Sequence, residues 1–290
     1  MRKVPSAYLK PLLATTFWGV SFIATKTALN ELTPVMIIIL RLLLGITFLI
    51  ILAVYTKSDF SIKFKQHAFI FLLAVIAVIH LWIQVTGLQY TSAANTGWII
   101  GTSPVFMTIM GMIFFKEKLT LSQLAGIIIA FAGLVLLISK GNIASIGFIS
   151  HKGDFLVLAS AFTWGAYSMV NKKISLTYPP VMTILYLFIM MAIILLPVTA
   201  NKETIFRLEH LSVISCISIL FLGIFCSGIS YVLWAQSLKD MDSSKVGAFL
   251  YFEPFVTVFS AWIFLNENIT LLMIISGIII ITGVIIVNRN

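Results

Sequence analysis

The chain has 290 residues, of which 60% are hydrophobic and only 10% are charged. Soluble domains carry about 25% charged residues, so this composition excludes a water-soluble fold and makes the lipid bilayer the natural solvent. The formal net charge is +9, but the basic residues are dispersed between apolar runs and form no patch that would bind nucleic acid. Dispersed basic residues are typical of loops that face an anionic cytoplasmic leaflet.

The residue types that usually hold metals and cofactors are sparse. Cys216 and Cys226 lie in one apolar run, and we interpret them as small buried side chains rather than a disulfide. The four histidines are far apart, so the sequence predicts no metal site and no cofactor. The first apolar run is longer than a signal peptide's and lacks a clean cleavage site, so we expect a membrane helix there.

Ten stretches are long and apolar enough to span a bilayer, which takes roughly 20 residues. In chain order they are Pro11–Leu29, Pro34–Tyr55, Ala68–Gln89, Ser92–Phe115, Leu121–Ser139, Asp154–Ile174, Val181–Thr199, Leu211–Ser237, Ser243–Leu265 and Ile269–Val287. The joints between them are too short to fold as a soluble domain. The sequence therefore predicts an all-α integral membrane protein with ten transmembrane helices.

The basic residues predict the orientation. If the N-terminus is cytoplasmic, thirteen of the 19 lysines and arginines fall in cytoplasmic segments. The other side holds four, and two more lie inside predicted helices: Lys140, Lys152, Lys202 and Arg207, then Lys26 and Arg41. This bias satisfies the positive-inside rule, so both termini are predicted to be cytoplasmic.

The two halves of the chain repeat each other. At an offset of 146 residues Trp18-Gly19 matches Trp164-Gly165, and Lys26 matches Lys172. Further along the offset becomes 150. There the matching pairs are Leu88 and Leu238, Gly97 and Gly247, Pro104 and Pro254, Glu117 and Glu267, Thr120 and Thr270, and Gly133 and Gly283. The order is preserved along the chain, which predicts two five-helix repeats over residues 1–140 and 141–290.

An odd number of helices per repeat has a physical consequence. The second copy enters the bilayer from the opposite side, so the repeats are inverted about an axis in the membrane plane. Inverted repeats can pack in two near-equivalent ways, one open to each side, which is the structural logic of alternating access. We therefore expect a carrier of small molecules with its site near the midplane, where the repeats meet.

Several motifs together resemble the EamA family of the drug/metabolite transporter superfamily, over essentially the whole chain. They are the Trp-Gly pairs of helices one and six, Arg41 in helix two, the prolines of helices four and nine, and the joints Phe115–Thr120 and Leu265–Thr270. The resemblance implies ten helices and secondary transport, often efflux of amino acids, related metabolites or toxic analogues. It also implies a central cavity lined by helices one, three, four, six, eight and nine.

Glu253 is the candidate residue with the strongest physical reason. It lies about halfway along the ninth predicted helix, where a carboxylate costs roughly 2.5–3.5 kcal/mol on insertion scales. The following Pro254 breaks the helix, and Pro104 matches it in the first repeat, so we expect both to act as hinges. Glu253 would serve as a proton site or bind a substrate ammonium. The alternative is a structural carboxyl that is hydrogen-bonded between helices.

Other intramembrane polar and aromatic residues are weaker candidates. His80 could relay protons or could bridge two helices structurally. Aromatic and polar pairs at helical spacing could form a cavity wall, although interfacial belts need no ligand: Asn95 with Trp98, Trp164 with Tyr167, and Tyr231 with Trp234. Trp18 and Trp164 are favoured because both repeats have them. Lys26 could bind an anionic group or could snorkel to the membrane surface.

Three further features are interpreted structurally. Arg41 is expected to tie its helix to neighbouring carbonyls, as the family resemblance suggests. Glu117 and Glu267 precede helix starts and are expected to act through helix-terminus electrostatics. Gly126, Ala130 and Gly133 form a small face that would pack within the repeat or form a homodimer contact.

The leading hypothesis is a secondary carrier in the bacterial inner membrane that exports amino acids or related metabolites, driven by a proton gradient or the substrate gradient. No phosphate-binding loop that would indicate ATP use is present in the sequence. One alternative is uptake or exchange of a nucleoside-like or sulfur-containing metabolite. A different class is an intramembrane enzyme, channel or scaffold, but no nucleophile or metal set supports catalysis, so no enzyme is predicted.

Overall fold

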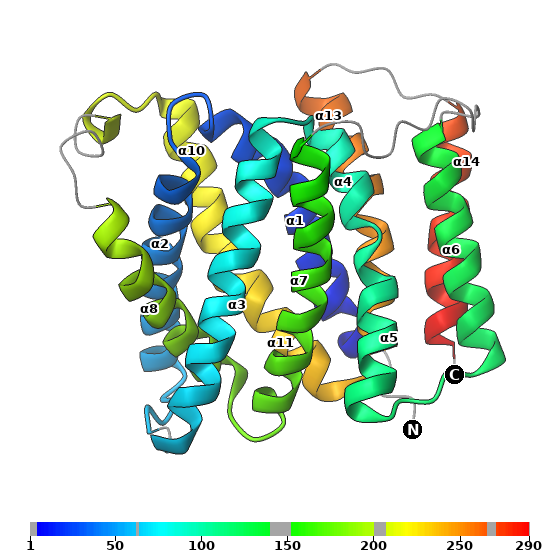
Figure 1. Cartoon of the computed structure of the whole chain (residues 1–290), viewed down its shortest axis with the longest axis horizontal. Helices are drawn as coiled ribbons and strands as arrows, with labels where there is room; N and C mark the ends of the chain where they lie inside the picture. Colours follow the sequence, from blue (N-terminus) through cyan, green and yellow to red (C-terminus); the bar gives the residue numbers. More distant parts are fainter. Residues whose placement is uncertain (1–4, 62–63, 140–151, 200–206, 266–270, 290) are drawn as a thin grey trace.

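A computed structural model of the protein describes residues 5–61, 64–139, 152–199, 207–265 and 271–289. Within these ranges the regular structure is entirely helical. The helices lie side by side in one bundle, and both chain ends lie at the same edge of it (Figure 1). We call this the terminal edge and the opposite one the far edge.

The first half of the chain forms six helical segments: α1 (Pro5–Ala28), α2 (Pro34–Tyr55), α3 (Phe64–Gln89), α4 (Ala93–Ile100), α5 (Ser103–Phe115) and α6 (Leu121–Ser139). The second half forms α7 (Lys152–Ser175), α8 (Pro180–Thr199), α10 (Val213–Phe221), the π-helix η2 (Leu222–Ile229), α11 (Ser230–Asp240), α12 (Ser243–Ala248), the 3₁₀-helix η3 (Phe249–Tyr251), α13 (Phe252–Leu265) and α14 (Leu271–Asn288).

Six helical stretches of the described residues are long and apolar enough to cross a membrane. They are Pro34–Tyr55, His67–Gln89, Ala93–Phe115, Pro180–Thr199, Val213–Asp240 and Ser243–Phe264. Two shorter apolar stretches, Leu121–Leu136 and Ile274–Asn288, accompany them. The protein is therefore a multi-pass membrane protein.

Several helix bounds differ from the sequence prediction, among them the start of α3 at Phe64 rather than Ala68. α1 begins at Pro5 and contains Pro11, which was expected at its start. α7 begins at Lys152 rather than Asp154, and the eighth span runs to Asp240 rather than Ser237. These ends lie in polar stretches, where apolarity alone does not mark the helix terminus.

Three predicted spans are interrupted helices. The fourth breaks at Gly101-Thr102 between α4 and α5, and the ninth passes through η3 between α12 and α13. Each break lies just before a proline, Pro104 or Pro254, which cannot donate to the carbonyl four residues earlier. The eighth span contains η2, where the hydroxyls of Ser227 and Ser230 donate to carbonyls five residues earlier.

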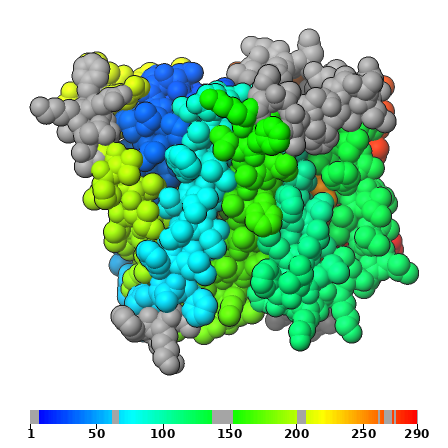
Figure 2. Space-filling model, viewed as in Figure 1, coloured from blue at the N-terminus to red at the C-terminus, as the bar shows by residue number. Residues whose placement is uncertain are grey.

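The packing between the halves is reciprocal. α1 packs on α11 and α13, while its counterpart α7 packs on α3, α4 and α5. α2 packs on α8, and α6 packs on α14. Figure 2 shows α3 and α7 side by side on one face of the molecule. The centre of the bundle is therefore built from both halves.

The small face of α6 packs on α14. A Cβ on Gly126 would lie 2.8 Å from the Gly283 carbonyl oxygen, and a Cβ on Gly133 would lie 2.9 Å from side-chain atoms of Ile279 and Ile280. The contact joins the two halves, so the expectation of packing within one repeat was wrong. Because α14 covers Gly126 and Gly133, a homodimer stays a prediction that needs another surface.

Candidate functional site

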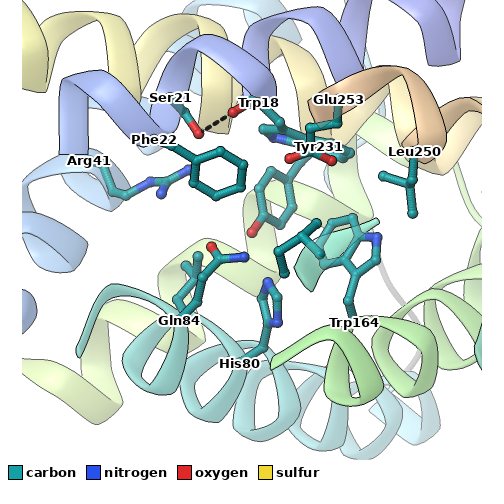
Figure 3. Close-up of a pocket in the computed structure, with 12 residues that line it drawn as sticks. Trp18, Ser21, Phe22, Arg41, His80, Gln84, Trp164, Tyr231, Leu250 and Glu253 are labelled. Carbon is teal, nitrogen blue, oxygen red and sulfur yellow. Dashed lines mark hydrogen bonds between the residues drawn. The ribbon is translucent and has the colours of Figure 1, made fainter. Parts of the chain in front are cut away.

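A cavity lies at the centre of the bundle between the two halves (Figure 3). Its walls come from α1, α2, α3, α4, α7, α11, η3 and α13, through Trp18, Ser21, Phe22, Arg41, His80, Leu81, Gln84, Ile100, Trp164, Tyr231, Leu250 and Glu253. The space left for water-sized molecules is about 30 Å³, which is room for roughly two waters. A metabolite fits only after the walls separate.

Glu253 is held in the cavity wall by the close approach of α13 to α1. It lies in the first turn of α13 and is 3% exposed. A Cβ on Gly19 would lie 2.8 Å from the Glu253 carbonyl oxygen, and the Thr257 hydroxyl donates to the carbonyls of both residues at 3.0 Å. The described hydrogen bonds include none to the Glu253 carboxyl. The carboxyl is therefore available to a proton or a solute.

His80 presents one ring nitrogen to α7 and leaves the other for a different partner. Its Nδ1 lies 2.9 Å from the Ser160 carbonyl oxygen, which only accepts, so Nδ1 is the donor. In the neutral imidazole Nε2 is then an acceptor. Gln84 lies one turn further along α3 and lines the same cavity, so α3 supplies a polar wall.

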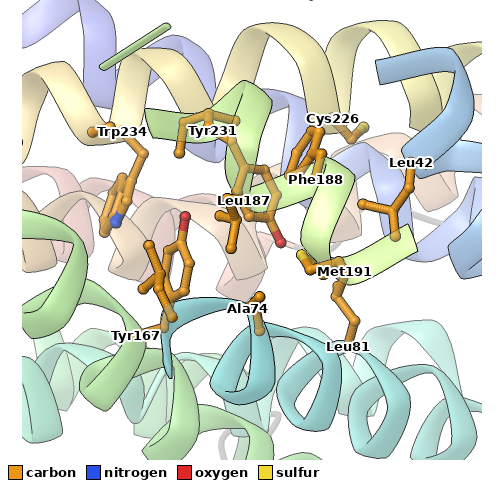
Figure 4. Close-up of a cluster of buried hydrophobic side chains, with 14 of the residues drawn as sticks. Leu42, Ala74, Leu81, Tyr167, Leu187, Phe188, Met191, Cys226, Tyr231 and Trp234 are labelled. Atoms are coloured by element: carbon orange, nitrogen blue, oxygen red, sulfur yellow. The ribbon is translucent and has the colours of Figure 1, made fainter. Parts of the chain in front are cut away.

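Five aromatic side chains from both halves form a continuous cluster beside this wall: Trp18, Trp164, Tyr167, Tyr231 and Trp234 (Figure 4 shows the last three). Trp18 and Trp164 meet edge to face at 4.9 Å, and Trp164 stacks on Tyr167 at the same separation. The predicted pairs on α7 and α11 thus come together with Trp18, and three of these rings line the cavity.

Arg41 is a cavity residue that the sequence interpretation missed. It is buried, and its Nε donates to Ser227 Oγ in the π-helix at 2.8 Å. Trp18 Nε1 donates to the neighbouring Cys226 carbonyl at 2.9 Å. Both bonds tie the first half to η2, and Arg41 does so through a hydroxyl rather than through the carbonyls that we expected. The sequence did contain a signal for this cavity residue, because an arginine at the eighth position of a membrane span must face a polar environment.

The two helix breaks are equivalent but carry different side chains. Pro104 and Pro254 leave the carbonyls of Ile100 and Leu250 without their usual donor, and both of those residues line the cavity. Ser103 occupies the position that corresponds to Glu253. Both halves therefore contribute a proline-interrupted helix to the site, but only the second half contributes a carboxyl group at that position.

Five sequence candidates do not line the cavity: Tyr167 and Trp234, which belong to the aromatic cluster, and Asn95, Trp98 and Lys26. Asn95 Nδ2 donates to Thr91 Oγ1 and, at 2.6 Å, to Asp154 Oδ1. Trp98 packs in a separate apolar cluster with Phe249 and Tyr251. Lys26 Nζ donates to the carbonyls of Leu88 and Thr91 at 2.7 and 2.8 Å, at the end of α3. These contacts close the far edge of the bundle.

A different set of contacts closes the terminal edge. Lys172 Nζ lies 2.7 Å from Glu117 Oε1 and also donates to the Met241 carbonyl and Ser243 Oγ. The Glu117 carboxylate accepts from the backbone N–H groups of Ser243 and Ser244 at the start of α12. Glu117 comes from the first half and its partners from the second. We call this group the Glu117–Lys172 latch.

The environment of Glu117 keeps it ionised. Partial burial raises the pKa of this carboxyl, but the hydrogen bonds and charge of Lys172 and the bonds from Ser243 outweigh burial and leave the pKa below its ordinary 4.5. Glu117 thus acts at a helix start, as expected, but the helix is α12 of the other half rather than α6, which Glu117 precedes in the chain. The counterpart Glu267 and its joint lie outside the described residues.

Comparison with known proteins identifies the family. The model of the EamA-like transporter family matches the chain twice, over residues 5–139 and 151–289. This chain belongs to the EamA-like transporter family. Members of this family are transporters, so the protein is not an enzyme, and its resemblance to the drug/metabolite transporter superfamily is confirmed.

Relatives and solved structures agree over nearly the whole length. An uncharacterized transporter of Archaeoglobus fulgidus is 32% identical, covering 94% of both chains. A protein of Escherichia coli named a probable amino-acid metabolite efflux pump is 27% identical over 94% of this chain and 91% of its own. A solved crystal structure matches with a TM-score of 0.76 at 17% identity, covering 97% of this chain and 96% of its own, which shows the fold alone.

Proposed function

We propose that this EamA-like transporter is a secondary carrier that exports amino acids or related small metabolites by alternating access. The observation that carries the proposal is the central cavity, which both halves line and which is closed at both edges by different contacts. A carrier needs such a closed state between its two open ones, whereas a channel needs a continuous path. The closed central cavity therefore favours a carrier over a channel or scaffold.

The amino-acid substrate class is supported by the cavity's chemistry and by relatives. Glu253 offers a carboxyl to an ammonium, Arg41 offers a cation, and the aromatic cluster offers apolar walls. The Escherichia coli relative and a 26% identical relative of Salmonella typhimurium are each named a probable amino-acid metabolite efflux pump. The aromatic rings would also stack on a nucleobase, so nucleosides belong in the test panel.

The topology belongs to the same proposal. We infer ten spans, with residues 1–140 and 141–290 as inverted halves, both termini in the cytoplasm and the protein in a bacterial inner membrane. The reciprocal packing of α1 with α11 and of α7 with α3 supports the inversion. The two ends of the chain at one edge support an even number of crossings. The terminal edge is then the cytoplasmic one.

The test is counterflow in proteoliposomes that are loaded with a panel of amino acids and nucleosides. We expect one or more labelled amino acids to accumulate with the wild-type protein. Glu253→Gln should retain solute exchange. The flux driven by a pH gradient should fall at least about tenfold, because the amide cannot carry the proton. Ser103→Ala at the equivalent position is the matched control and should leave both fluxes unchanged.

Each outcome decides a different part of the proposal. Exchange of nucleosides but not amino acids would show that the substrates are nucleoside-like metabolites. No exchange of any solute by folded protein would contradict the carrier function. Equal loss of exchange and gradient-driven flux in Glu253→Gln would leave Glu253 as a substrate ligand alone and would remove its role in proton coupling.

A further inference from the structure

The two equivalent tryptophans of the cavity differ in their hydrogen bonding. Trp18 and Trp164 occupy matching positions in the two halves, and both are almost fully buried, at 7% and 5% exposure. The Trp18 indole N–H donates to the Cys226 carbonyl in the π-helix. The Trp164 indole N–H is buried and finds no hydrogen-bond partner in the described part of the chain.

The difference has a structural cause in the helix that faces each ring. Trp18 faces η2, which offers it the Cys226 carbonyl. At an offset of 150, the counterpart of Cys226 is Ile76, which lies inside the regular α-helix α3. The described part of α3 provides no carbonyl that accepts from the Trp164 indole N–H, whereas η2 places the Cys226 carbonyl within reach of Trp18.

A buried donor without a partner is unfavourable, and native structures nearly always satisfy such groups. In the closed state the Trp164 N–H makes no stabilising contact, because stacking on Tyr167 and contact with His80 involve only the faces and edges of the ring. In Figure 3 its nitrogen lies on the side of the ring that faces Leu250, another cavity residue. A partner must come from outside the closed protein.

We propose that the Trp164 indole N–H is a substrate-binding donor, which hydrogen-bonds an acceptor oxygen of the solute while the cavity is occupied. The proposal rests on the carrier function and sharpens it. Glu253 lines the same cavity and takes a cationic or donor group. Trp164 and Glu253 together select a small solute that carries an ammonium group and, in addition, a carboxylate or carbonyl oxygen. Trp18 has the structural role, and Trp164 has the binding role.

The experiment compares matched changes at the two tryptophans. Trp164→Phe and Trp18→Phe are measured for melting temperature in detergent and for KM in counterflow with a labelled mixture of the standard amino acids. A second pair places benzothienylalanine at position 164 or 18, which replaces the indole N–H by sulfur and keeps the shape of the ring. This pair separates loss of the hydrogen bond from loss of packing.

At position 164 the sulfur analogue should keep the wild-type melting temperature and raise KM at least about fivefold, as loss of one hydrogen bond to a charged acceptor requires. At position 18 it should lower the melting temperature and raise KM less than the same change does at position 164. A competing mixture of the corresponding amines, which lack the carboxylate, should inhibit wild type and the position-164 analogue equally.

Three results would overturn the proposal. A melting temperature that falls at position 164 as much as at position 18 would show that the N–H has a structural partner. An unchanged KM at position 164 in an active carrier would show that the solute does not use the N–H. If wild type exchanges no amino acid, the carrier proposal fails for this class and the donor role fails with it.

Discussion

Lys26 and Lys172 are equivalent residues at opposite edges of the bundle, and their contacts differ in one respect. Each donates to the carbonyl at the end of the third span of its own half, Thr91 for Lys26 and Met241 for Lys172. Lys172 also pairs with Glu117, which reaches across from the other half. The far edge is crossed by Asp154, which accepts from the neutral side chains of Thr91 and Asn95.

The comparison shows how the two edges can open separately. At the terminal edge, separation of the halves breaks a buried ion pair and uncaps α12, which leads through η3 to Glu253. At the far edge, Lys26 stays bonded within its own half, and Asp154 loses its bonds from Thr91 and Asn95. In an alternating-access carrier, different contacts at the two edges would set which open state is more populated. The following changes alter one edge, or one half, at a time.

The largest effect is expected at the latch. Lys172→Met leaves the Glu117 carboxylate buried without its cation, which costs roughly 2–4 kcal/mol in the closed state. The terminal edge should open, and exchange should fall at least about tenfold because the carrier is held on one side. Counterflow and accessibility of the cavity to a thiol reagent measure the two effects. Glu117→Gln combined with Lys172→Met should recover part of the loss, and no recovery would argue against a direct pair.

A smaller effect is expected at the Trp-Gly pairs. In Gly19→Ala the new Cβ would lie 2.7 Å from Val256 Cβ and 2.8 Å from the Glu253 carbonyl oxygen, so α13 must move. We expect about 1–3 kcal/mol of destabilisation and a lower affinity for solute. Gly165→Ala is the control, since its Cβ would come no closer than 3.2 Å to its neighbours, Met110 Sδ and Phe106 Cβ. Equal melting temperatures for the two variants would contradict the close approach of α1 and α13.

Lys26→Met should have a modest effect of about 1 kcal/mol, because the Leu88 and Thr91 carbonyls lose a donor at the end of α3. Exchange should fall less than threefold, in contrast with Lys172→Met. The measurement is counterflow of both variants in the same vesicles. A loss from Lys26→Met that matched that of Lys172→Met would remove the distinction between the two edges.

The smallest effect is the response of the latch to pH. Because the folded-state pKa of Glu117 lies below its ordinary 4.5, the stabilisation is complete above that value and is lost only as pH falls through the lowered pKa. Thiol accessibility through the terminal edge should therefore be constant between about pH 8 and pH 5. A transition in this interval that Glu117→Gln abolishes would contradict the assignment.

The sequence predicted much of the site, because helical spacing identifies residues that share a face. Trp164 with Tyr167 and Tyr231 with Trp234 come together around Trp18. Spacing does not tell which face points to the centre, and so Asn95 and Trp98 were wrongly expected in the same wall.

Two features of the fold and site had no usable sequence signal. The π-helix requires one shifted register of backbone hydrogen bonds, which leaves no mark on apolar periodicity. Lys26 has a long side chain that reaches carbonyls 62 and 65 residues away in the chain. The helix breaks, in contrast, followed from Pro104 and Pro254, whose missing N–H is a local property.

Alternating access requires that one cavity open in turn to the two sides of the membrane. The direct measurement places a thiol at Ser21→Cys in a protein whose Cys216 and Cys226 are replaced by serine, and adds a membrane-impermeant thiol reagent to either side of oriented vesicles. We expect slow labelling of the wild-type background from each side. In Lys172→Met, labelling should be faster from the terminal-edge side and slower from the opposite side. Labelling that rises from both sides at once would indicate a continuous pore and would rule out alternating access.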